Sequence, residues 1–117
     1  MKKTIIIFVF TFFFSGFNPA LAEVVINEIA WKGTATNSNE WLELANTDTI
    51  VDISGWTIKD LTGQLNITLP DGATISGGGF YVIKRNNSDI IPFDFPTAFN
   101  GGLSDAGEKL ILTDAAG

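Results

Sequence analysis

The sequence contains no cysteine and no histidine. Without cysteine there is no disulfide, no thiol nucleophile and no thiolate metal site, so packing and hydrogen bonds alone must hold the fold. Without histidine there is no Ser-His-Asp triad, and the most frequent general base and transition-metal ligand are missing. These two absences exclude most of the familiar catalytic centres.

Positive charge is also scarce. The chain has 7 Lys and Arg against 13 Asp and Glu, and two of the basic residues belong to the opening Met-Lys-Lys. Residues 23–117 alone carry five basic and thirteen acidic side chains, a net charge of −8. Affinity for a phosphate backbone comes from lysine and arginine, and Lys84-Arg85 is the only adjacent basic pair in this part. Direct binding of nucleic acid is therefore not expected.

The N-terminus has the three parts of a secretory signal peptide. A basic Met-Lys-Lys start precedes an apolar run at residues 5–14, and Ala20-Leu21-Ala22 is the small-x-small pattern that signal peptidase accepts. The apolar run is shorter than the roughly 20 residues of a membrane-spanning helix, which argues against an uncleaved anchor. We expect residues 1–22 to be a signal peptide and residues 23–117 a domain. The product is then secreted or held at the cell surface, without a membrane span.

Short apolar segments separated by turn residues recur after the signal, and no helical period appears. Leu42 and Leu44 share one face of an extended segment at 40–46, and Trp56 and Ile58 share one face of the next. This spacing predicts an all-β sandwich or barrel. Further strands are predicted at 24–31 (antiparallel to 40–46), 65–69, 73–75, 80–84 (a central strand) and 108–113.

The alternation also predicts which side chains are buried. The predicted core signature is Leu42, Leu44, Trp56, Ile58, Val82 and Leu110. In the first strand neither face is cleanly apolar. Regular alternation there places Val25, Asn27, Ile29 and Trp31 on one face, and Val24, Ile26, Glu28 and Ala30 on the other.

Several segments in this order and spacing resemble the lamin tail domain in its bacterial form. They include Ile-Asn-Glu-Ile at 26–29, Glu-Trp-Leu-Glu-Leu-Ala-Asn at 40–46, Ser-Gly-Trp-Thr-Ile-Lys-Asp at 54–60, Leu-Pro-Asp-Gly at 69–72, Gly-Gly-Phe-Tyr-Val-Ile at 78–83, and Leu-Ser-Asp-Ala-Gly-Glu-Lys-Leu at 103–110. The resemblance implies an immunoglobulin-like β-sandwich. It also implies a module that binds proteins and DNA in nuclear lamins, and that accompanies exported hydrolases in bacteria without being an enzyme itself.

One departure from the family concerns the end of the chain. Members of the family usually continue into a last strand after the turn that matches residues 114–117, so the resemblance implies that this domain lacks its last strand. Our hypothesis is a non-catalytic binding or positioning module of an exported or cell-surface protein. The alternative is an accessory domain of a longer secreted hydrolase, of the nuclease or phosphoesterase type, whose catalytic part follows residue 117.

The acidic residues do not predict a catalytic or metal site. Glu40 and Glu43 point to opposite faces of one strand, so we expect both at the solvated face or rim, with Glu28 bonded to backbone or to Asn27. No spacing resembles a calcium loop. We therefore predict no catalytic residue, no metal and no cofactor. The aspartates considered as calcium ligands are Asp48, Asp52, Asp60, Asp105 and Asp114.

Exposed aromatics give the predicted interaction surface. Trp41 points away from the Leu42 and Leu44 face, so it is either exposed or packed under a loop. Phe93 and Phe95 lie in an irregular segment at residues 90–102. Exposed aromatic side chains can anchor an interface or stack on sugars, so we expect a protein or surface polymer as partner.

Overall fold

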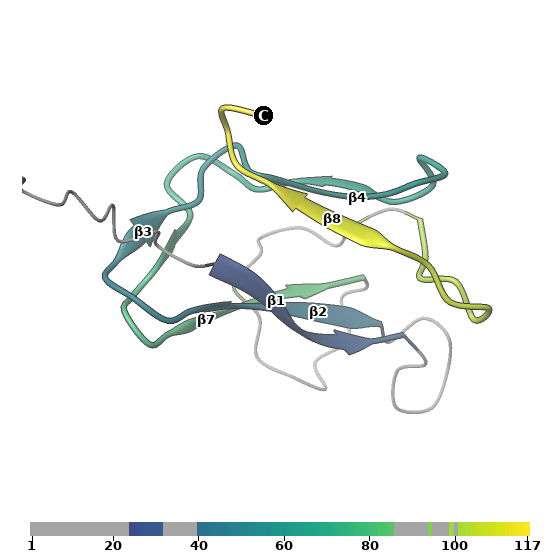
Figure 1. Ribbon diagram of the computed structural model, residues 1–117, viewed down its shortest axis with the longest axis horizontal. Helices are drawn as coiled ribbons and strands as arrows, with labels where there is room; N and C mark the ends of the chain where they lie inside the picture. The colour runs from purple at the N-terminus through teal and green to yellow at the C-terminus, as the bar shows by residue number, and fades with distance from the viewer. Residues whose placement is uncertain (1–23, 32–39, 86–93, 95–98, 100) are drawn as a thin grey trace, which may run out of the picture.

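The computed structural model describes residues 24–31, 40–85, 94, 99 and 101–117. The strands are β1 (Val24–Ala30), β2 (Trp41–Asn46), β3 (Val51–Asp52), β4 (Thr57–Asp60), β5 (Asn66–Thr68), β6 (Thr74–Ile75), β7 (Phe80–Lys84) and β8 (Leu110–Thr113). They form two three-stranded sheets, β1-β2-β7 and β5-β4-β8, and a small β3-β6 sheet. The larger sheets lie as two layers, with β3 at one end (Figure 1).

The all-β prediction is confirmed, because the described residues contain strands and turns but no helix. Accordingly, this part of the chain offers no helix with the length and apolar character that crossing a bilayer requires. The predicted antiparallel pairing of the first two strands is also confirmed. The predicted signal peptide lies outside the described residues.

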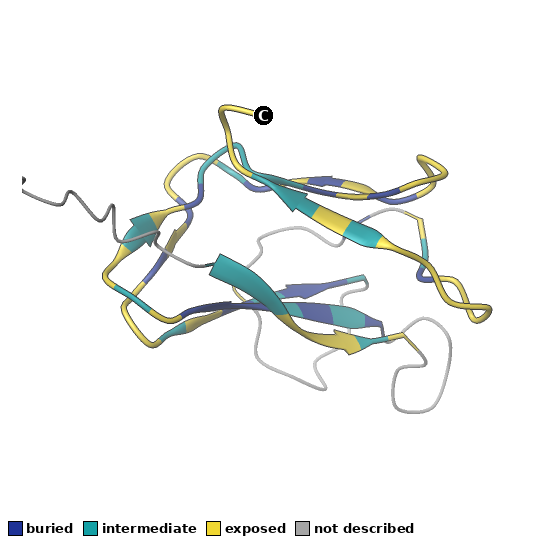
Figure 2. Cartoon of the chain, in the orientation of Figure 1, coloured by how far each residue is buried: buried dark blue, intermediate teal, exposed yellow. Residues whose placement is uncertain are grey.

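Most members of the buried cluster are leucines and isoleucines. Figure 2 shows where the buried residues lie along the strands. Leu42, Leu44 and Ile58 are all 0% exposed, as the alternation of β2 and β4 requires. Trp56 and Leu110 are partly buried against this cluster. The rest of the buried cluster comprises Ile53, Leu65, Ile67, Leu69, Ala73, Ile75, Tyr81, Ile83, Phe99 and Leu103.

Val82 does not belong to this core, and the prediction that placed it there is wrong. In the pairing of β2 with β7, Leu42 lies opposite Ile83 and Leu44 lies opposite Tyr81. Cross-strand partners share a face, so Ile83 and Tyr81 point inward while half-buried Val82 lies on the outer face, opposite Glu43. Because β7 is apolar on both faces, its composition gave no sign of which face is buried.

The central position predicted for β7 is also wrong, because among the described strands β7 lies at one edge of its sheet. Its edge is nevertheless covered by main chain. The N–H of Asp94 donates to the Val82 carbonyl at 3.0 Å, and the N–H of Phe99 donates to the Lys84 carbonyl at 3.2 Å. The Val82 N–H donates to Asp94 Oδ2 at 2.8 Å. These bonds satisfy edge groups that a bare outer strand would expose.

A β-bulge corrects the faces predicted for the first strand. The register of β1 against β2 shifts between Ile26 and Glu28. Ile26 lies opposite Leu44 and Ile29 lies opposite Leu42, so both lie on the inner face although they are three residues apart. A bulge inserts one unpaired residue and reverses the alternation beyond it. This explains why regular alternation left both faces of the strand mixed.

The bulge also rearranges the polar groups on the outer face. Glu28 lies opposite Glu43, a like-charge pair that would destabilise the sheet. The Asn27 side-chain N–H donates to Glu43 Oε1 at 2.7 Å. Of the two partners predicted for Glu28, backbone or Asn27, the Asn27 amide bonds instead to Glu43 across the strand pair.

Candidate binding groove

The predicted interaction surface is described only in part. Trp41 is half-buried and lies opposite Ala30 and Lys84 in the β1-β2-β7 sheet. Phe93 and Phe95 lie outside the described residues. Trp41 alone therefore provides no open aromatic surface.

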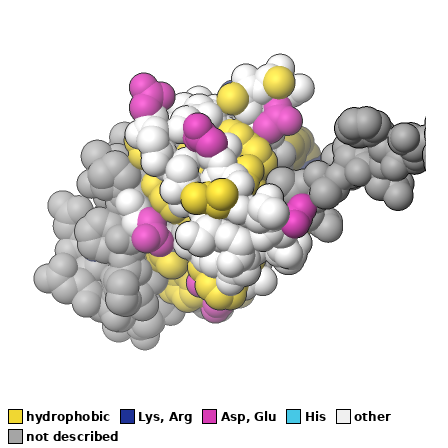
Figure 3. Space-filling model, turned by 90° about the vertical axis from the view of Figure 1, so that its left-hand side faces the viewer, with side chains coloured by type: hydrophobic (Ala, Val, Ile, Leu, Met, Phe, Trp, Pro, Cys, Tyr) yellow, Lys and Arg dark blue, Asp and Glu magenta, His cyan; other side chains and the backbone are white. Residues whose placement is uncertain are grey.

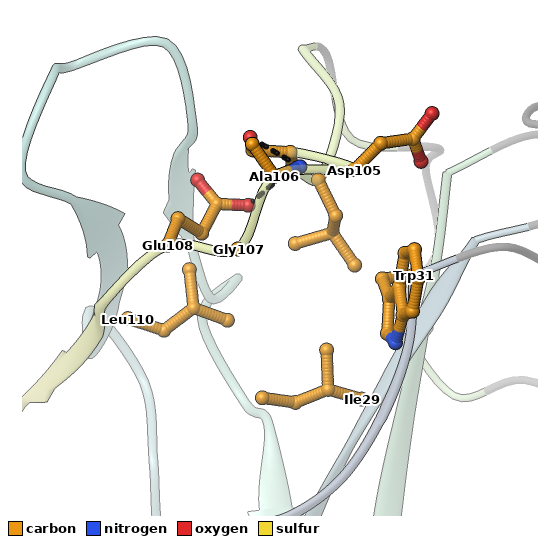
Figure 4. A pocket seen from close by; sticks show the side chains of 9 residues that line it. Ile29, Trp31, Asp105, Ala106, Gly107, Glu108 and Leu110 are labelled. Atoms are coloured by element: carbon orange, nitrogen blue, oxygen red, sulfur yellow. Dashed lines mark hydrogen bonds between the residues drawn. The ribbon is translucent and has the colours of Figure 1, made fainter.

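A groove of about 510 Å³ lies instead between the end of β1 and the segment leading into β8. Trp31 and Ile29 form one side of it, and Leu110 faces them (Figure 4). Its size falls within the range of ligand sites in proteins. The lining residues are Ile29, Trp31, Leu103, Ser104, Asp105, Ala106, Gly107, Glu108 and Leu110.

The apolar side chains of the groove remain partly exposed because no described strand closes this side of the sandwich. Both β1 and β8 are outer strands of their sheets. Ile29 is 44% exposed and Trp31 is 40% exposed, although the bulge turns Ile29 toward the inner face. Sequence reasoning missed this site because it read β1 without the bulge. The mixed faces of that strand were the available signal.

A hydrogen-bonded turn forms the acidic rim of the groove. The Gly107 N–H donates to the Ser104 carbonyl at 3.0 Å, and the Ser104 N–H donates to Glu108 Oε1 at 2.8 Å. The Ala106 N–H donates to Ser104 Oγ at 3.2 Å. Asp105 and Glu108 are both exposed. The turn thus holds two carboxylates beside an apolar surface (Figure 4).

Glu40 anchors the chain at the base of this rim. Glu40 is 2% exposed, and its Oε2 lies 3.0 Å from Arg85 Nη1 and accepts a hydrogen bond from the Leu103 N–H at 2.9 Å. The prediction of a solvated Glu40 is therefore wrong. Both partners are far away in the sequence, so the residues around Glu40 could not reveal them. Glu43, on the opposite face, is half-buried and bonded to Asn27.

Two glycines allow the same segment to pack closely. A Cβ on Gly101 would lie 2.4 Å from the Gln64 carbonyl oxygen, and the φ of Gly101 is +91°. A Cβ on Gly102 would lie 2.7 Å from Arg85 Nη1. Any larger residue at 101 would meet both a strained backbone and a steric overlap. Gly101 and Gly102 thus bring Leu103 to the Glu40 carboxylate.

The adjacent basic pair does not form an exposed basic patch. Lys84 is only 3% exposed, and Arg85 forms the ion pair with Glu40. Acidic side chains are instead spread among apolar ones on the face shown in Figure 3. That face is the β3 end of the molecule; at the groove itself the acidic side chains are those of Asp105 and Glu108.

Three of the five aspartates considered as calcium ligands, Asp52, Asp60 and Asp114, hold turns. Thr62 Oγ1 donates to Asp60 Oδ2 at 2.6 Å, and this bond is the main reason why the pKa of Asp60 lies below its ordinary value. Hydrogen bonds from Ser54 likewise lower the pKa of Asp52. Asp114 Oδ1 accepts the N–H groups of Ala116 and Gly117. Across the described residues, no three Asp or Glu side chains gather closely enough to hold a metal ion.

Of the comparisons with known proteins, the one with family models gives a match. No curated protein and no solved structure matches the chain. The family model described as Lamin Tail Domain matches residues 18–117. The two layers of antiparallel strands around one apolar core agree with the immunoglobulin-like fold that the resemblance implied. The resemblance is confirmed: the chain belongs to the lamin tail domain family.

Proposed function

We propose that this chain is a non-catalytic binding module of an exported or cell-surface protein, and that it binds its partner through the groove between β1 and β8. Membership of the lamin tail domain family supports a module without catalytic activity. The signal-like N-terminus supports export. The partner is a protein or a polymer of the cell surface.

The partly exposed Ile29 and Trp31 are the observation that carries this proposal. Ile29 lies on the inner face of the sandwich, where large apolar side chains ordinarily lie in the core, and Trp31 lines the same groove just after β1. Their exposure leaves apolar area that a partner can remove from water. Tryptophan is also among the residues that contribute most to binding energy at interfaces.

Retention on cell surfaces tests the proposal. The protein purified from the medium or envelope of its producing cells is expected to begin at Glu23, as measured by mass spectrometry. After fluorescent labelling it should be retained on washed envelopes of those cells. Trp31→Ala should reduce retention at least fivefold, whereas Leu61→Ala should not, because Leu61 is 68% exposed on the β4–β5 turn and does not line the groove.

Two results would contradict the proposal. One is recovery of the uncleaved chain inside the cell. The other is equal retention of wild-type protein and the Trp31→Ala variant, measured on variants whose urea unfolding midpoints match that of the wild type. The second result would not contradict export, but it would show that the groove does not bind the partner.

A further inference from the structure

A second pocket, of about 390 Å³, lies beside the outer strand β7. Residues 70–74, Tyr81 and Asp94 line it, and we call it the Tyr81 pocket. None of these residues belongs to β1 or β8, which border the groove. Because β1 and β7 lie at opposite edges of one sheet, the Tyr81 pocket and the groove are separate sites. Its volume is within the range of ligand sites in proteins.

The hydroxyl of Tyr81 is the observation that points to a ligand. The side chain is only 5% exposed, and it belongs to the apolar core cluster. No hydrogen bond joins its hydroxyl to a residue in the described part of the chain. The same part contains no sealed side-chain oxygen that lacks a partner, so this hydroxyl must open onto the pocket that Tyr81 lines. Polar groups that are this deeply buried are normally hydrogen-bonded, and here a ligand can supply the bond.

Two hydrogen bonds fix Asp94 at the same pocket. Its N–H donates to the Val82 carbonyl at 3.0 Å, and its Oδ2 accepts the Val82 N–H at 2.8 Å. A carboxylate has about four lone-pair positions, so Asp94 can still accept hydrogen bonds from a ligand. The Asp94 charge also contributes to the raised pKa of Tyr81, which means that the carboxylate lies near the phenol.

Asp71 brings a second carboxylate to the pocket from a well-fixed turn. The Ala73 N–H donates to the Pro70 carbonyl at 3.2 Å, and the Gly72 N–H donates to Ser54 Oγ at 2.9 Å. Gly72 has a φ of +80°, which glycine adopts without strain. The Asp71 side chain is exposed at the tip of this turn. The turn therefore holds a carboxylate in place that the fold itself does not require.

Two carboxylates and a neutral hydroxyl favour a positively charged ligand. The described lining of the pocket includes no lysine or arginine that could neutralise them. A calcium ion takes six to eight oxygen ligands, and no three acidic side chains gather within the described residues. A stacked sugar is also a poor fit, because the Tyr81 ring is buried and presents no open face.

A primary ammonium group matches the three acceptors. It carries three N–H donors and no acceptor, and the pocket offers it two carboxylates and one hydroxyl oxygen. Pro70 and Ala73 add apolar atoms to the lining, which suit the methylene stem of a lysine side chain. We propose that Asp71, Asp94 and Tyr81 form a binding site for the ammonium group of a lysine side chain on a partner polypeptide. This second site goes beyond the proposed function, because it does not depend on the groove.

Nuclear magnetic resonance titration of the purified, ¹⁵N-labelled protein tests the proposal. The probe is the capped tripeptide Gly-Lys-Gly at low salt. Its matched control carries Nε-acetyl-lysine, which keeps the methylene stem and removes the charge. The lysine probe should shift the amide signals of Gly72, Val82 and Asp94, which lie in or beside the pocket, with little change at Trp31 in the groove. The acetylated probe should bind at least tenfold more weakly.

Three variants connect the binding to the side chains of the pocket. Asp71→Asn should weaken binding of the lysine probe at least fivefold, and Tyr81→Phe, which removes only the hydroxyl, at least threefold. Glu28→Gln is the matched control, because Glu28 is exposed, does not line the pocket and loses the same single charge. Its affinity for the probe should equal that of the wild type. Spectra of the free variants that superimpose on that of the wild type show that the fold is intact.

Several results would overturn the proposal. Equal affinity for the lysine and acetyl-lysine probes, or no binding of either, would exclude an ammonium site. Equal weakening by Glu28→Gln and Asp71→Asn would show that the probe senses only the net charge of the chain. Tighter binding of a capped Gly-Arg-Gly peptide would assign the pocket to a guanidinium group, and tighter binding of glucosamine would assign it to an amine-bearing polysaccharide. Loss of envelope retention in Trp31→Ala concerns the groove alone, so the two proposals can fail separately.

Discussion

The middle of the sandwich and its β1–β8 side contain the same kinds of side chain in different environments. Leu42, Leu44 and Ile58 are fully buried because β2 and β4 lie inside their sheets and face each other across the core. Ile29 and Trp31 also lie on the β1 side that faces the core, yet both remain more than a third exposed. Among the described residues, burial in this fold therefore depends on having a strand opposite.

Substitution of one leucine and one isoleucine should give the largest contrast between the two regions. Leu44→Ala should lower the free energy of unfolding by about 3–5 kcal/mol, because it removes buried methyl groups and leaves a cavity. Ile29→Ala should cost only about 1 kcal/mol, because part of the side chain is already in water and no closed cavity forms. Urea unfolding followed by tryptophan fluorescence measures both. Similar losses for the two variants would mean that the β1–β8 side is closed in solution.

Loss of the Glu40 carboxylate should have an intermediate effect. Glu40→Ala removes the partner of Arg85 and leaves the buried Leu103 N–H without its acceptor, which should cost about 2–4 kcal/mol. The exposed Glu28 provides the matched control, and Glu28→Ala should change stability by about 0.5 kcal/mol or less. Because Leu103 also lines the groove, Glu40→Ala should speed limited proteolysis near it. An unchanged urea midpoint would show that the ion pair does not anchor this segment.

The smallest predicted effect concerns the pKa of Tyr81, whose phenol lies in the buried part of the core. Burial is the main cause that raises the pKa of Tyr81 above its ordinary 10.0, with the Asp94 charge as a second cause. The folded state favours the neutral phenol, so its contribution to stability is complete below pH 10 and is lost as the pH rises through the folded pKa. Since the chain has one tyrosine, an absorbance titration reports Tyr81 alone.

Comparison with a Tyr81→Phe variant separates this effect from general alkaline unfolding. The variant should lose less stability than wild type between neutral pH and pH 11. A titration midpoint at or below the ordinary value of 10.0 would show that water reaches the phenol and that this part of the core is open.

Much of the fold could be predicted from local patterns. The shared face of Leu42 and Leu44 located β2 and its inward leucines. Pro70-Asp71-Gly72 has the composition of a turn, and the structure closes one there with an Ala73 N–H to Pro70 carbonyl bond of 3.2 Å. These features depend on side-chain direction and backbone preference within a few residues. Neighbouring sequence is therefore enough to specify them.

The candidate site could not be predicted in the same way. The sequence shows Trp31 as a tryptophan at the end of a strand. Only the pairing of β1 with β2 reveals the bulge, and the bulge decides to which side of the sheet the residues after it point. Glu40 looked like a solvated acid because its partners, Arg85 and Leu103, lie 45 and 63 residues further along the chain. Val82 could not be told from its apolar neighbours in β7 until the register was known.

The sequence by itself determined the fold class, the family and the chemistry that is absent, because composition and alternation are properties of the chain alone. The tertiary structure decided which face of β1 and β7 is buried, which acid lies inside, and which of the described strands lie at the edges of the sheets. Each of these depends on a pairing between distant strands, and a shift of one residue in that pairing turns a side chain from the core to the surface.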